Sequence, residues 1–248
     1  KGLSAISKVA DVSLQNTLWE ESSVLFAKGN KPDEAIATSR KIISTDKRLH
    51  ATLAVLDLLL SRHDYENAKI CWDEAWQMAE KLEEQDEKNE TRTQLAYRIG
   101  MMKQWGHAQQ IAMELPEYHK ISALARLARE AHVYGNHLKS QELFELAIKK
   151  SKHLKEQKDT ALCEIVENLA FTGQCQKGYK LFLKITDDTE SNRALYGGIV
   201  EFLDKMEDEN AALVLAKKLE KHTCDEGKGM PWSKAAMLMA RKGKFKKA

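Results

Sequence analysis

Small and apolar residues recur every three or four positions along the segment from Ala68 to Gln85. This spacing places them along one face of an α-helix, while charged residues such as Asp73 fill the opposite face. The segment has a counterpart 72 residues later, from Ser140 to Gln157. The matched pairs are Ala68 and Ser140, Trp72 and Phe144, Ala75 and Ala147, Ala79 and Ser151, Leu82 and Leu154, Glu84 and Glu156, and Gln85 and Gln157. Because an amphipathic helix cannot bury its apolar face alone, a repeated one predicts a stack of neighbouring helices.

A tight-turn pattern followed by a small residue recurs along the chain. The small residues are Ala35, Ala68, Ala108, Ser140, Gly178, Ala211 and Ala248, and their successive spacings are 33, 40, 32, 38, 33 and 37 residues. A small side chain one turn into a helix lets that helix approach its neighbour closely, so each turn is expected to join two antiparallel helices. The turns carry Gly29, Gly135, Gly173 and Gly243, which we expect in the left-handed conformation that ends a helix. Asp64 and Asn136 are expected to be N-caps, and Pro32 a first helical residue.

These signals predict an all-α fold of paired helices. The first helices of the pairs are expected at 17–28, 49–62, 91–104, 119–134, 159–172, 190–205 and 231–242, and the second helices at 33–44, 65–88, 107–115, 138–157, 175–185 and 208–222. Residues 3–13 are expected to be the second helix of an incomplete unit, and Phe245 and Ala248 to open another. We therefore predict one helical-repeat domain over residues 1–248, with about six full helix pairs and partial repeats at both ends, as in a fragment of a longer protein.

Composition and charge narrow the function classes. The chain is 43% hydrophobic and 31% charged, and its 39 basic and 37 acidic residues leave a net charge of +2. This balance gives no whole-molecule attraction to nucleic acid, so such binding would need a local patch. The four cysteines form no close pair, and the apolar run from Leu53 to Leu60 contains Asp57 and is too short to cross a bilayer. We expect a cytoplasmic protein with no membrane span.

Two charged segments follow the repeated helix. Glu80 to Arg92 is mainly acidic, and Lys149 to Lys158 is mainly basic. Both are expected to be helical extensions, and two interpretations stay open. They are solvated helix ends, or they are ridges recognised by partners of opposite charge.

Catalytic and metal-binding patterns are not found in the sequence. The eight histidines include no His-Glu-x-x-His pattern, no Cys-x-x-Cys occurs, and the cluster of His222, Cys224, Asp225 and Glu226 is explained by a polar turn. Cys163 is either a packing residue or a groove thiol. The aromatic residues expected in the core are Trp72, Trp76, Trp105, Phe144, Phe171 and Phe182. We expect no catalytic residue, no cofactor and no metal, and hence no enzyme.

Two segments share a turn pattern. In Ala240 to Ala248, a turn Gly is followed by an aromatic residue and then Ala, and His63 to Ala68 is similar. This pattern resembles the turn of the tetratricopeptide repeat. Trp19 and Trp232 match the early aromatic position of that family, and Ser23, Ala96, Ala128 and Ala236 match its close-packing position. The chain departs from the family where the larger Leu56, Val166 and Ile199 stand at the close-packing position and where Met206 replaces the turn Gly. The resemblance covers the chain from about Gln15 onwards, with irregular repeats.

The resemblance implies a right-handed α-solenoid of stacked antiparallel helix pairs. In that family the first helices line a concave face that binds a peptide or a protein segment. The partner-binding residues implied here are Gln94, Tyr97, Arg126, Arg129, Glu164, Glu167, Arg193 and Tyr196. Other residues implied on this face are Glu20, Val24, Asp57 and Val200. The alternative is that these are ordinary exposed residues paired within and between neighbouring helices.

The favoured hypothesis is a protein–protein interaction scaffold or adaptor whose partner is a protein or peptide. One alternative is an RNA-binding helical-repeat protein, which would need a recurring polar code along the first helices. The equivalent positions instead run from Glu20 and Leu53 to Tyr196 and Ser233, so nucleic acid is not the expected partner. A second alternative is an accessory domain of an enzyme whose catalytic part lies outside this segment. The sequence leaves the identity of the partner and the oligomeric state open.

Overall fold

The structure is a computed structural model that describes residues 2–187 and, beyond them, residues 213, 214, 216, 217, 233, 235–237, 239 and 240. Within this part of the chain every regular element is an α-helix. The prediction of an all-α fold is therefore confirmed. The chain divides into two compact units, Lys1–Leu115 and Pro116–Ala248.

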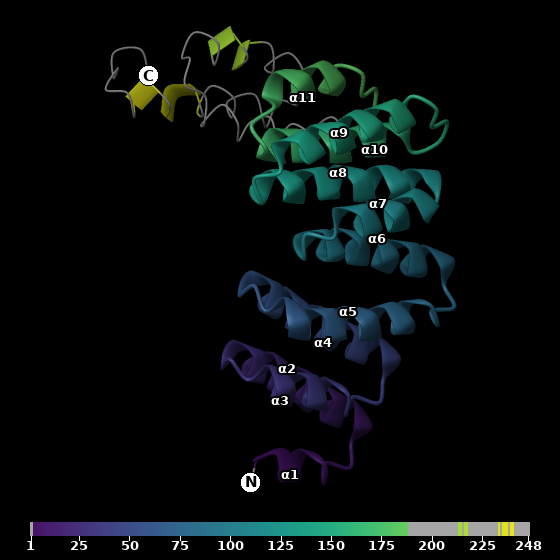
Figure 1. The fold of residues 1–248 in the computed structure, drawn as a ribbon, viewed down its shortest axis with the longest axis vertical. Helices are drawn as coiled ribbons and strands as arrows, with labels where there is room; N and C mark the ends of the chain where they lie inside the picture. Colours follow the sequence, from purple (N-terminus) through teal and green to yellow (C-terminus); the bar gives the residue numbers. More distant parts are fainter. Residues whose placement is uncertain are drawn as a thin grey trace. The chain divides into compact units, whose positions relative to one another are not determined.

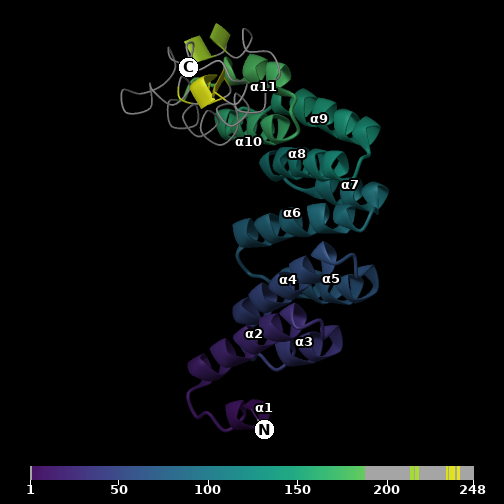
Figure 2. The ribbon, with the colours of Figure 1, turned by 90° about the vertical axis from the view of Figure 1, so that its left-hand side faces the viewer.

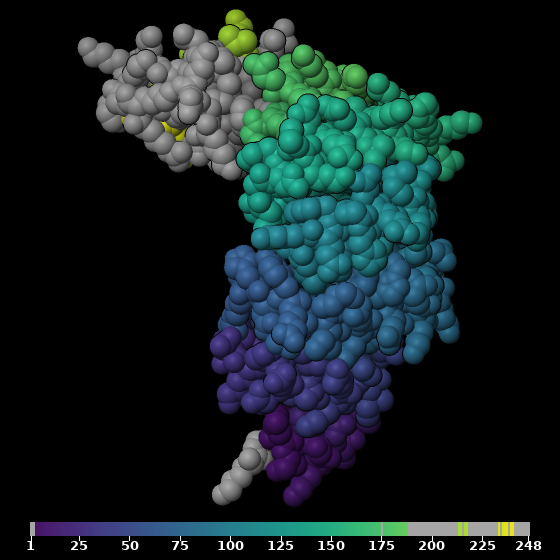
Figure 3. Space-filling view, viewed as in Figure 1, coloured from purple at the N-terminus to yellow at the C-terminus, as the bar shows by residue number. Residues whose placement is uncertain are grey.

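Unit 1 contains seven helices in its described residues (Figure 1). They are α1 (Gly2–Ile6), α2 (Val12–Lys28), α3 (Pro32–Ser39), α4 (Thr45–Ser61), α5 (Tyr65–Ala79), α6 (Gln85–Met101) and α7 (Trp105–Glu114). Helix α2 packs against α3, α4 against α5, and α6 against α7, so that consecutive helices form pairs. The pairs follow one another as layers, with α2 against α4 and α5 against α6 (Figure 2). On the face that it draws, the space-filling view shows a continuous surface over these layers, coloured from purple to teal (Figure 3).

Unit 2 repeats this arrangement with two described pairs. They are α8 (Glu117–Val133) with α9 (His137–Ser151), and α10 (Lys158–Phe171) with α11 (Cys175–Phe182). Helix α10 also packs against both α8 and α9, so the second pair is stacked on the first. The predicted organisation in helix pairs therefore describes each unit, while the helices expected at 190–205, 208–222 and 231–242 lie largely outside the described residues.

The five described pairs are joined by turns of equal length and geometry. Each turn has three residues, and the middle one has a positive φ: Asn30 (59°), His63 (60°), Lys103 (64°), Gly135 (77°) and Gly173 (76°). In the α8–α9 turn, the Gly135 N–H donates to the His132 carbonyl (2.9 Å) and the Asn136 N–H to the Ala131 carbonyl (2.8 Å). This pattern satisfies carbonyls that the helix end leaves free.

The prediction for these turns is correct for Gly135 and Gly173 and wrong for Gly29. Gly29 has φ −77°, and its neighbour Asn30 adopts the left-handed conformation instead. Asparagine tolerates this region better than most residues, so the middle of the turn does not require glycine. Gly243 lies outside the described residues.

A small residue occupies the fourth position of the second helix in every described pair. These residues are Ala35, Ala68, Ala108 and Ser140, each at most 1% exposed, and the buried Gly178. A Cβ added to Gly178 would lie 3.6 Å from the Leu169 Cβ, which is ordinary contact. The predicted close approach of the paired helices is therefore confirmed at these positions, whereas Ala211 and Ala248 lie outside the described residues.

The 72-residue repeat is reproduced in the lengths and caps of α5 and α9. Both helices have 15 residues. The Asp64 side chain accepts a hydrogen bond from the Asn67 N–H (3.3 Å), and the Asn136 side chain accepts one from the Lys139 N–H (3.2 Å). These are the N-caps expected from the sequence. Pro32 also begins α3 as predicted.

The two predicted helical extensions are wrong. Helix α5 ends at Ala79 and α6 begins at Gln85, whereas one helix was expected over 65–88. Helix α9 ends at Ser151 and α10 begins at Lys158, whereas one helix was expected over 138–157. The charged residues of these segments are good helix formers and no Gly or Pro marks the breaks, so the local sequence does not signal them.

Several helix boundaries also differ from the prediction. Residues 3–13 do not form one helix, because α1 ends at Ile6 and α2 begins at Val12 with the Asp11 side chain as its cap. Helix α6 likewise begins at Gln85 rather than at residue 91. The first turns of α2 and α6 are rich in polar residues, so apolar periodicity detects only the half of each helix that is buried.

Apolar side chains fill the space between the layers. Trp72 is 4% exposed, donates its indole N–H to the Leu95 carbonyl (2.8 Å) and stacks on Trp76 with ring centroids 5.3 Å apart. Phe144, its counterpart in unit 2, is fully buried. The expectation that Phe171 belongs to the core is wrong, because its side chain is 57% exposed at the end of α10.

Candidate functional site

The residues predicted to bind a partner fall into two groups. Gln94 and Tyr97 lie on α6 in unit 1, and Arg126, Arg129, Glu164 and Glu167 lie on α8 and α10 in unit 2. Arg193 and Tyr196 lie outside the described residues. The predicted residues that the structure describes therefore form two clusters, one in each unit.

Arg126 and Glu164 join the two first helices of unit 2. Each lies seven residues before the last residue of its helix, and α8 packs against α10. The Arg126 Nε lies 3.7 Å from the Glu164 Oε2, with the side chains 27% and 15% exposed. This ion pair links equivalent positions of successive layers and remains partly accessible to solvent.

Arg129 lies one turn further along α8 and contacts an exposed aromatic ring. Its Nε and Nη2 donate to the Glu130 Oε1 at 3.0 and 2.8 Å. Its guanidinium carbon is 5.1 Å from the ring centroid of Phe171 on α10. Because the Phe171 side chain is 57% exposed, the cation covers only part of the ring and leaves apolar surface in water.

Glu167 completes the cluster on α10. Its Oε1 lies 3.4 Å from the Sγ of Cys163, one turn earlier on the same helix. Cys163 is fully buried, so it is a packing residue rather than a groove thiol. We refer to Arg126, Arg129, Glu130, Glu164, Glu167 and Phe171 together as the α8–α10 surface.

The cluster in unit 1 is organised by Arg98, a residue that the sequence analysis missed. The Arg98 Nε and Nη2 donate to the two carboxylate oxygens of Asp57 on α4, both at 2.8 Å. Its Nη1 also lies 3.3 Å from the Gln94 Oε1, and its guanidinium lies 4.9 Å from the Tyr97 ring centroid. Gln94 and Tyr97 therefore surround an ion pair between α4 and α6.

Burial and pairing act in opposite directions on Arg98. Its side chain is only 7% exposed, whereas that of Asp57 is 50% exposed. Burial lowers the pKa of Arg98, but the hydrogen bonds and the charge of Asp57 outweigh it and raise the pKa above its ordinary value. The sequence shows an Asp and an Arg on successive first helices. It does not show the register between α4 and α6 that brings Arg98, rather than Tyr97, to Asp57.

One buried thiol and the arrangement of possible metal ligands bear on the chemistry that the described residues can support. Burial, with a smaller contribution from Glu74, raises the pKa of Cys71 to about 12, so this thiol stays protonated. Among the residues that the structure describes, no group of three or more His, Cys, Asp or Glu side chains converges on a metal position. The arrangement offers charged and aromatic contacts for binding.

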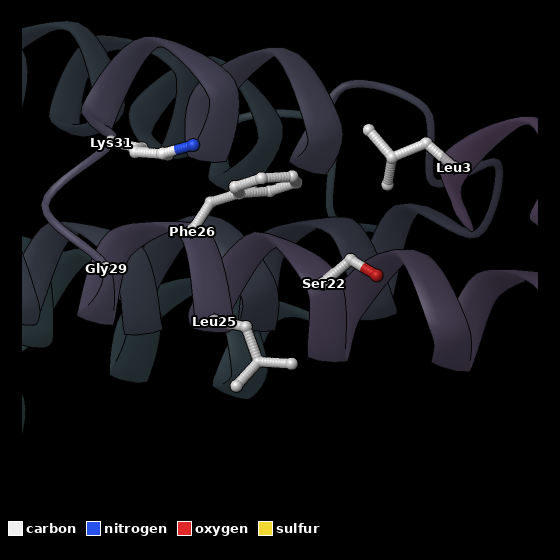
Figure 4. A pocket seen from close by; sticks show the side chains of 6 residues that line it. All are labelled: Leu3, Ser22, Leu25, Phe26, Gly29 and Lys31. Atoms are coloured by element: carbon white, nitrogen blue, oxygen red, sulfur yellow. The ribbon is translucent and has the colours of Figure 1, made fainter. Parts of the chain in front are cut away.

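A hollow of about 370 Å³ lies beside α1 and α2 in unit 1 (Figure 4). It is lined by Leu3, Ser22, Leu25, Phe26, Gly29 and Lys31. The Phe26 ring lies between the side chains of Leu3 and Lys31, while Leu25 points away from them. The hollow has an apolar lining with one cation at its edge and includes none of the predicted site residues.

A second hollow, of about 620 Å³, lies at the start of α10. The Asp159 Oδ2 on its wall accepts hydrogen bonds from the Thr186 N–H (2.9 Å), the Thr186 hydroxyl (2.7 Å) and the Asp187 N–H (2.8 Å). Burial raises the pKa of Asp159, but these hydrogen bonds outweigh it, so the pKa is lowered. The carboxylate fastens the segment after α11 to α10, which is a structural role.

Comparisons with known proteins give a likeness in structure. No family model matches the chain, and no curated protein is found to be similar to it. Among solved structures it is similar to Ton1535 from Thermococcus onnurineus NA1, with a TM-score of 0.51 and 16% identity, over 92% of this chain and 73% of that chain. At this identity the likeness concerns the fold alone. In the described residues, no helix has both the length and the apolar character needed to cross a membrane.

Proposed function

We propose that the chain is a protein-interaction scaffold that binds a peptide or a segment of a partner protein on the α8–α10 surface. The observation that carries the proposal is Phe171, which is 57% exposed and partly covered by the Arg129 guanidinium. Arginine and aromatic side chains contribute most to the energy of protein interfaces. An aromatic ring left in water beside an arginine is therefore suited to bind a partner.

The charged residues around Phe171 are held in place before a partner binds. Arg129 is anchored by Glu130, and Arg126 by Glu164. Ordering a flexible side chain on binding costs about 0.5–1.5 kcal/mol, so anchored side chains reduce that cost. The surface fits an extended segment with an apolar side chain over Phe171, an acidic group near the arginines and an amide or basic group near Glu167.

The balance of charge on this surface favours protein over RNA. Two arginines are set among Glu130, Glu164 and Glu167, and these carboxylates repel phosphate groups.

As part of the same proposal, the paired helices form a right-handed, tetratricopeptide-like solenoid with these first helices on its concave face. The five equal turns and the stacking of first helices within each unit support it. We also propose a cytoplasmic, non-enzymatic protein, and the free buried thiols Cys71 and Cys163 support the reducing compartment.

A peptide-display selection tests the proposal. Peptides selected on the wild-type chain are labelled, and their affinities are measured by fluorescence anisotropy for the wild type and for Phe171→Ser. Loss of a central aromatic contact costs about 2 kcal/mol or more, so the Kd is expected to rise about thirtyfold. Arg129→Glu is expected to weaken binding at least as much, because it also reverses a charge.

The matched control is Leu183→Ser, which removes an apolar side chain that is 50% exposed just after α11. It should leave the affinity of the selected peptides unchanged. Equal binding to the wild type and Phe171→Ser, or an equal loss in Leu183→Ser, would place the binding surface elsewhere. A salt-dependent mobility shift with generic RNA that Arg129→Glu abolishes would favour the RNA alternative instead.

A further inference from the structure

Two histidine rings meet across the α8–α9 turn. The Nδ1 atoms of His132 and His137 are 3.3 Å apart, and the ring centroids are 4.7 Å apart with an angle of 62° between the planes. His132 belongs to the last turn of α8, and His137 is the first residue of α9. Neither residue belongs to the α8–α10 surface.

The hydrogen-bonded backbone of the turn sets the positions from which the two side chains extend. Gly135 has φ 77° and donates its N–H to the carbonyl of His132 (2.9 Å). Asn136 caps α9 through the Lys139 N–H (3.2 Å), which fixes the start of the helix that carries His137. The pair is therefore placed by the same rigid turn that joins the two helices.

We propose that His132 and His137 form a binding site for a divalent first-row transition-metal ion such as Zn²⁺. An ion about 2.0–2.1 Å from each of two nitrogens in tetrahedral geometry separates those nitrogens by about 3.3–3.4 Å. The observed separation is 3.3 Å, so both Nδ1 atoms reach such an ion after a small rotation of the rings. Water or a group from another molecule completes the coordination.

The ligand type decides which ions such a pair can take. Metal binding needs neutral imidazoles. Imidazole nitrogens prefer Zn²⁺, Ni²⁺ and Cu²⁺ to Mg²⁺ and Ca²⁺, which take oxygen ligands. Without metal, the Nδ1–H of one ring donates a hydrogen bond to the Nδ1 of the other. When the ion binds, the donating ring loses its Nδ1 proton to solvent and takes one up at Nε2, so that each ring is neutral and both Nδ1 lone pairs form coordinate bonds.

The experiment is a titration of the purified chain with Zn²⁺ and Cu²⁺ in competition with a coloured chelator. It compares the wild type with His132→Gln, His137→Gln and, as a matched control, His153→Gln, which replaces an exposed histidine outside the pair. The wild type and His153→Gln are expected to bind one equivalent of metal ion. His132→Gln and His137→Gln are each expected to bind it at least about tenfold more weakly, because removing even a residue that only hydrogen-bonds to a metal ligand lowers metal affinity by about this factor. Cu²⁺ is expected to bind more tightly than Zn²⁺, and Mg²⁺ not to compete.

Binding that remains in both pair variants reports other sites, such as the cysteines or the segment of His222 and Cys224, which lies outside the described residues. Equal stoichiometry and affinity in all four proteins overturn the proposal. A loss in only one of the two pair variants also overturns it, since both rings must bind the same ion. Unchanged circular dichroism of the variants confirms that the helices are intact.

Discussion

The segments that follow α5 and α9 have the same place in the repeat and opposite charge. Residues 77–87 contain five carboxylates and one lysine, a net charge of −4, whereas residues 149–159 contain five lysines and two carboxylates, a net charge of +3. Yet α5 and α9 have the same length, equivalent caps and the same buried face. The comparison shows that the apolar positions, small residues and caps determine the structure shared by α5 and α9. The charge of the segment that follows each helix can differ without changing that structure.

The two segments also use their charges differently. In the first, the Lys88 ammonium on α6 donates to the Glu80 carbonyl (2.8 Å) and lies 3.1 Å from its carboxylate, which closes the end of α5. In the second, Lys152 and Lys155 form no ion pair with any residue in the described part of the chain and are exposed. The acidic segment therefore satisfies part of its charge within unit 1, and the basic segment presents its charge to solvent.

The strongest test of the comparison removes the matched aromatic residues. Trp72→Ala and Phe144→Ala are each expected to lower the free energy of unfolding by about 3–5 kcal/mol, the usual cost of such cavities. Trp72→Ala should cost at least as much as Phe144→Ala, because it also leaves the Leu95 carbonyl without its indole donor. Denaturant unfolding followed by circular dichroism measures both. A cost below about 1 kcal/mol for Phe144→Ala would contradict the interpretation that Phe144 has the same buried role in unit 2 as Trp72 has in unit 1.

A subtler test exchanges the matched small residues. Ser140 is 1% exposed and its hydroxyl has no hydrogen-bond partner among the residues that the structure describes, whereas its counterpart Ala68 carries no polar group. Ser140→Ala is therefore expected to raise the free energy of unfolding by about 1 kcal/mol, and Ala68→Ser to lower it by a similar amount. Chemical unfolding of both variants gives the two signs. A destabilising Ser140→Ala would show that the hydroxyl is satisfied in solution.

The smallest effect is expected from the surface charges. Glu80→Gln removes the partner of Lys88 and Arg92, whose side chains are each 19% exposed. The expected loss is below about 1 kcal/mol and should shrink as salt screens the pair. Unfolding midpoints at low and high salt measure it, with Glu83→Gln, an exposed neighbour, as the control. A loss that is large and independent of salt would mean that charge does determine where α5 ends.

The sequence was sufficient where the signal is local. The N-caps Asp64 and Asn136 and the small residues such as Ala68 were predictable because a few neighbouring residues specify each one. The breaks at Ala79 and Ser151 were not, because no Gly or Pro marks either helix end.

The candidate site was predicted less completely, for reasons of register and exposure. The six predicted residues that the structure describes lie on helices expected from the sequence, but the pairing of Asp57 with Arg98 depends on the register between α4 and α6. The exposure of Phe171 depends on which elements reach the end of α10, and none of the described helices covers its ring fully. The His132–His137 contact spans a turn, which periodicity along a helix does not reveal.

The equal three-residue turns have a consequence for how such a chain diversifies. Each turn fixes the spacing of its two helices through backbone hydrogen bonds and one left-handed residue, so the joint makes few demands on the remaining side chains. A duplicated pair can inherit its joint unchanged while its outer faces acquire new chemistry. Such turns permit one chain to contain an acidic and a basic copy of the same helix pair.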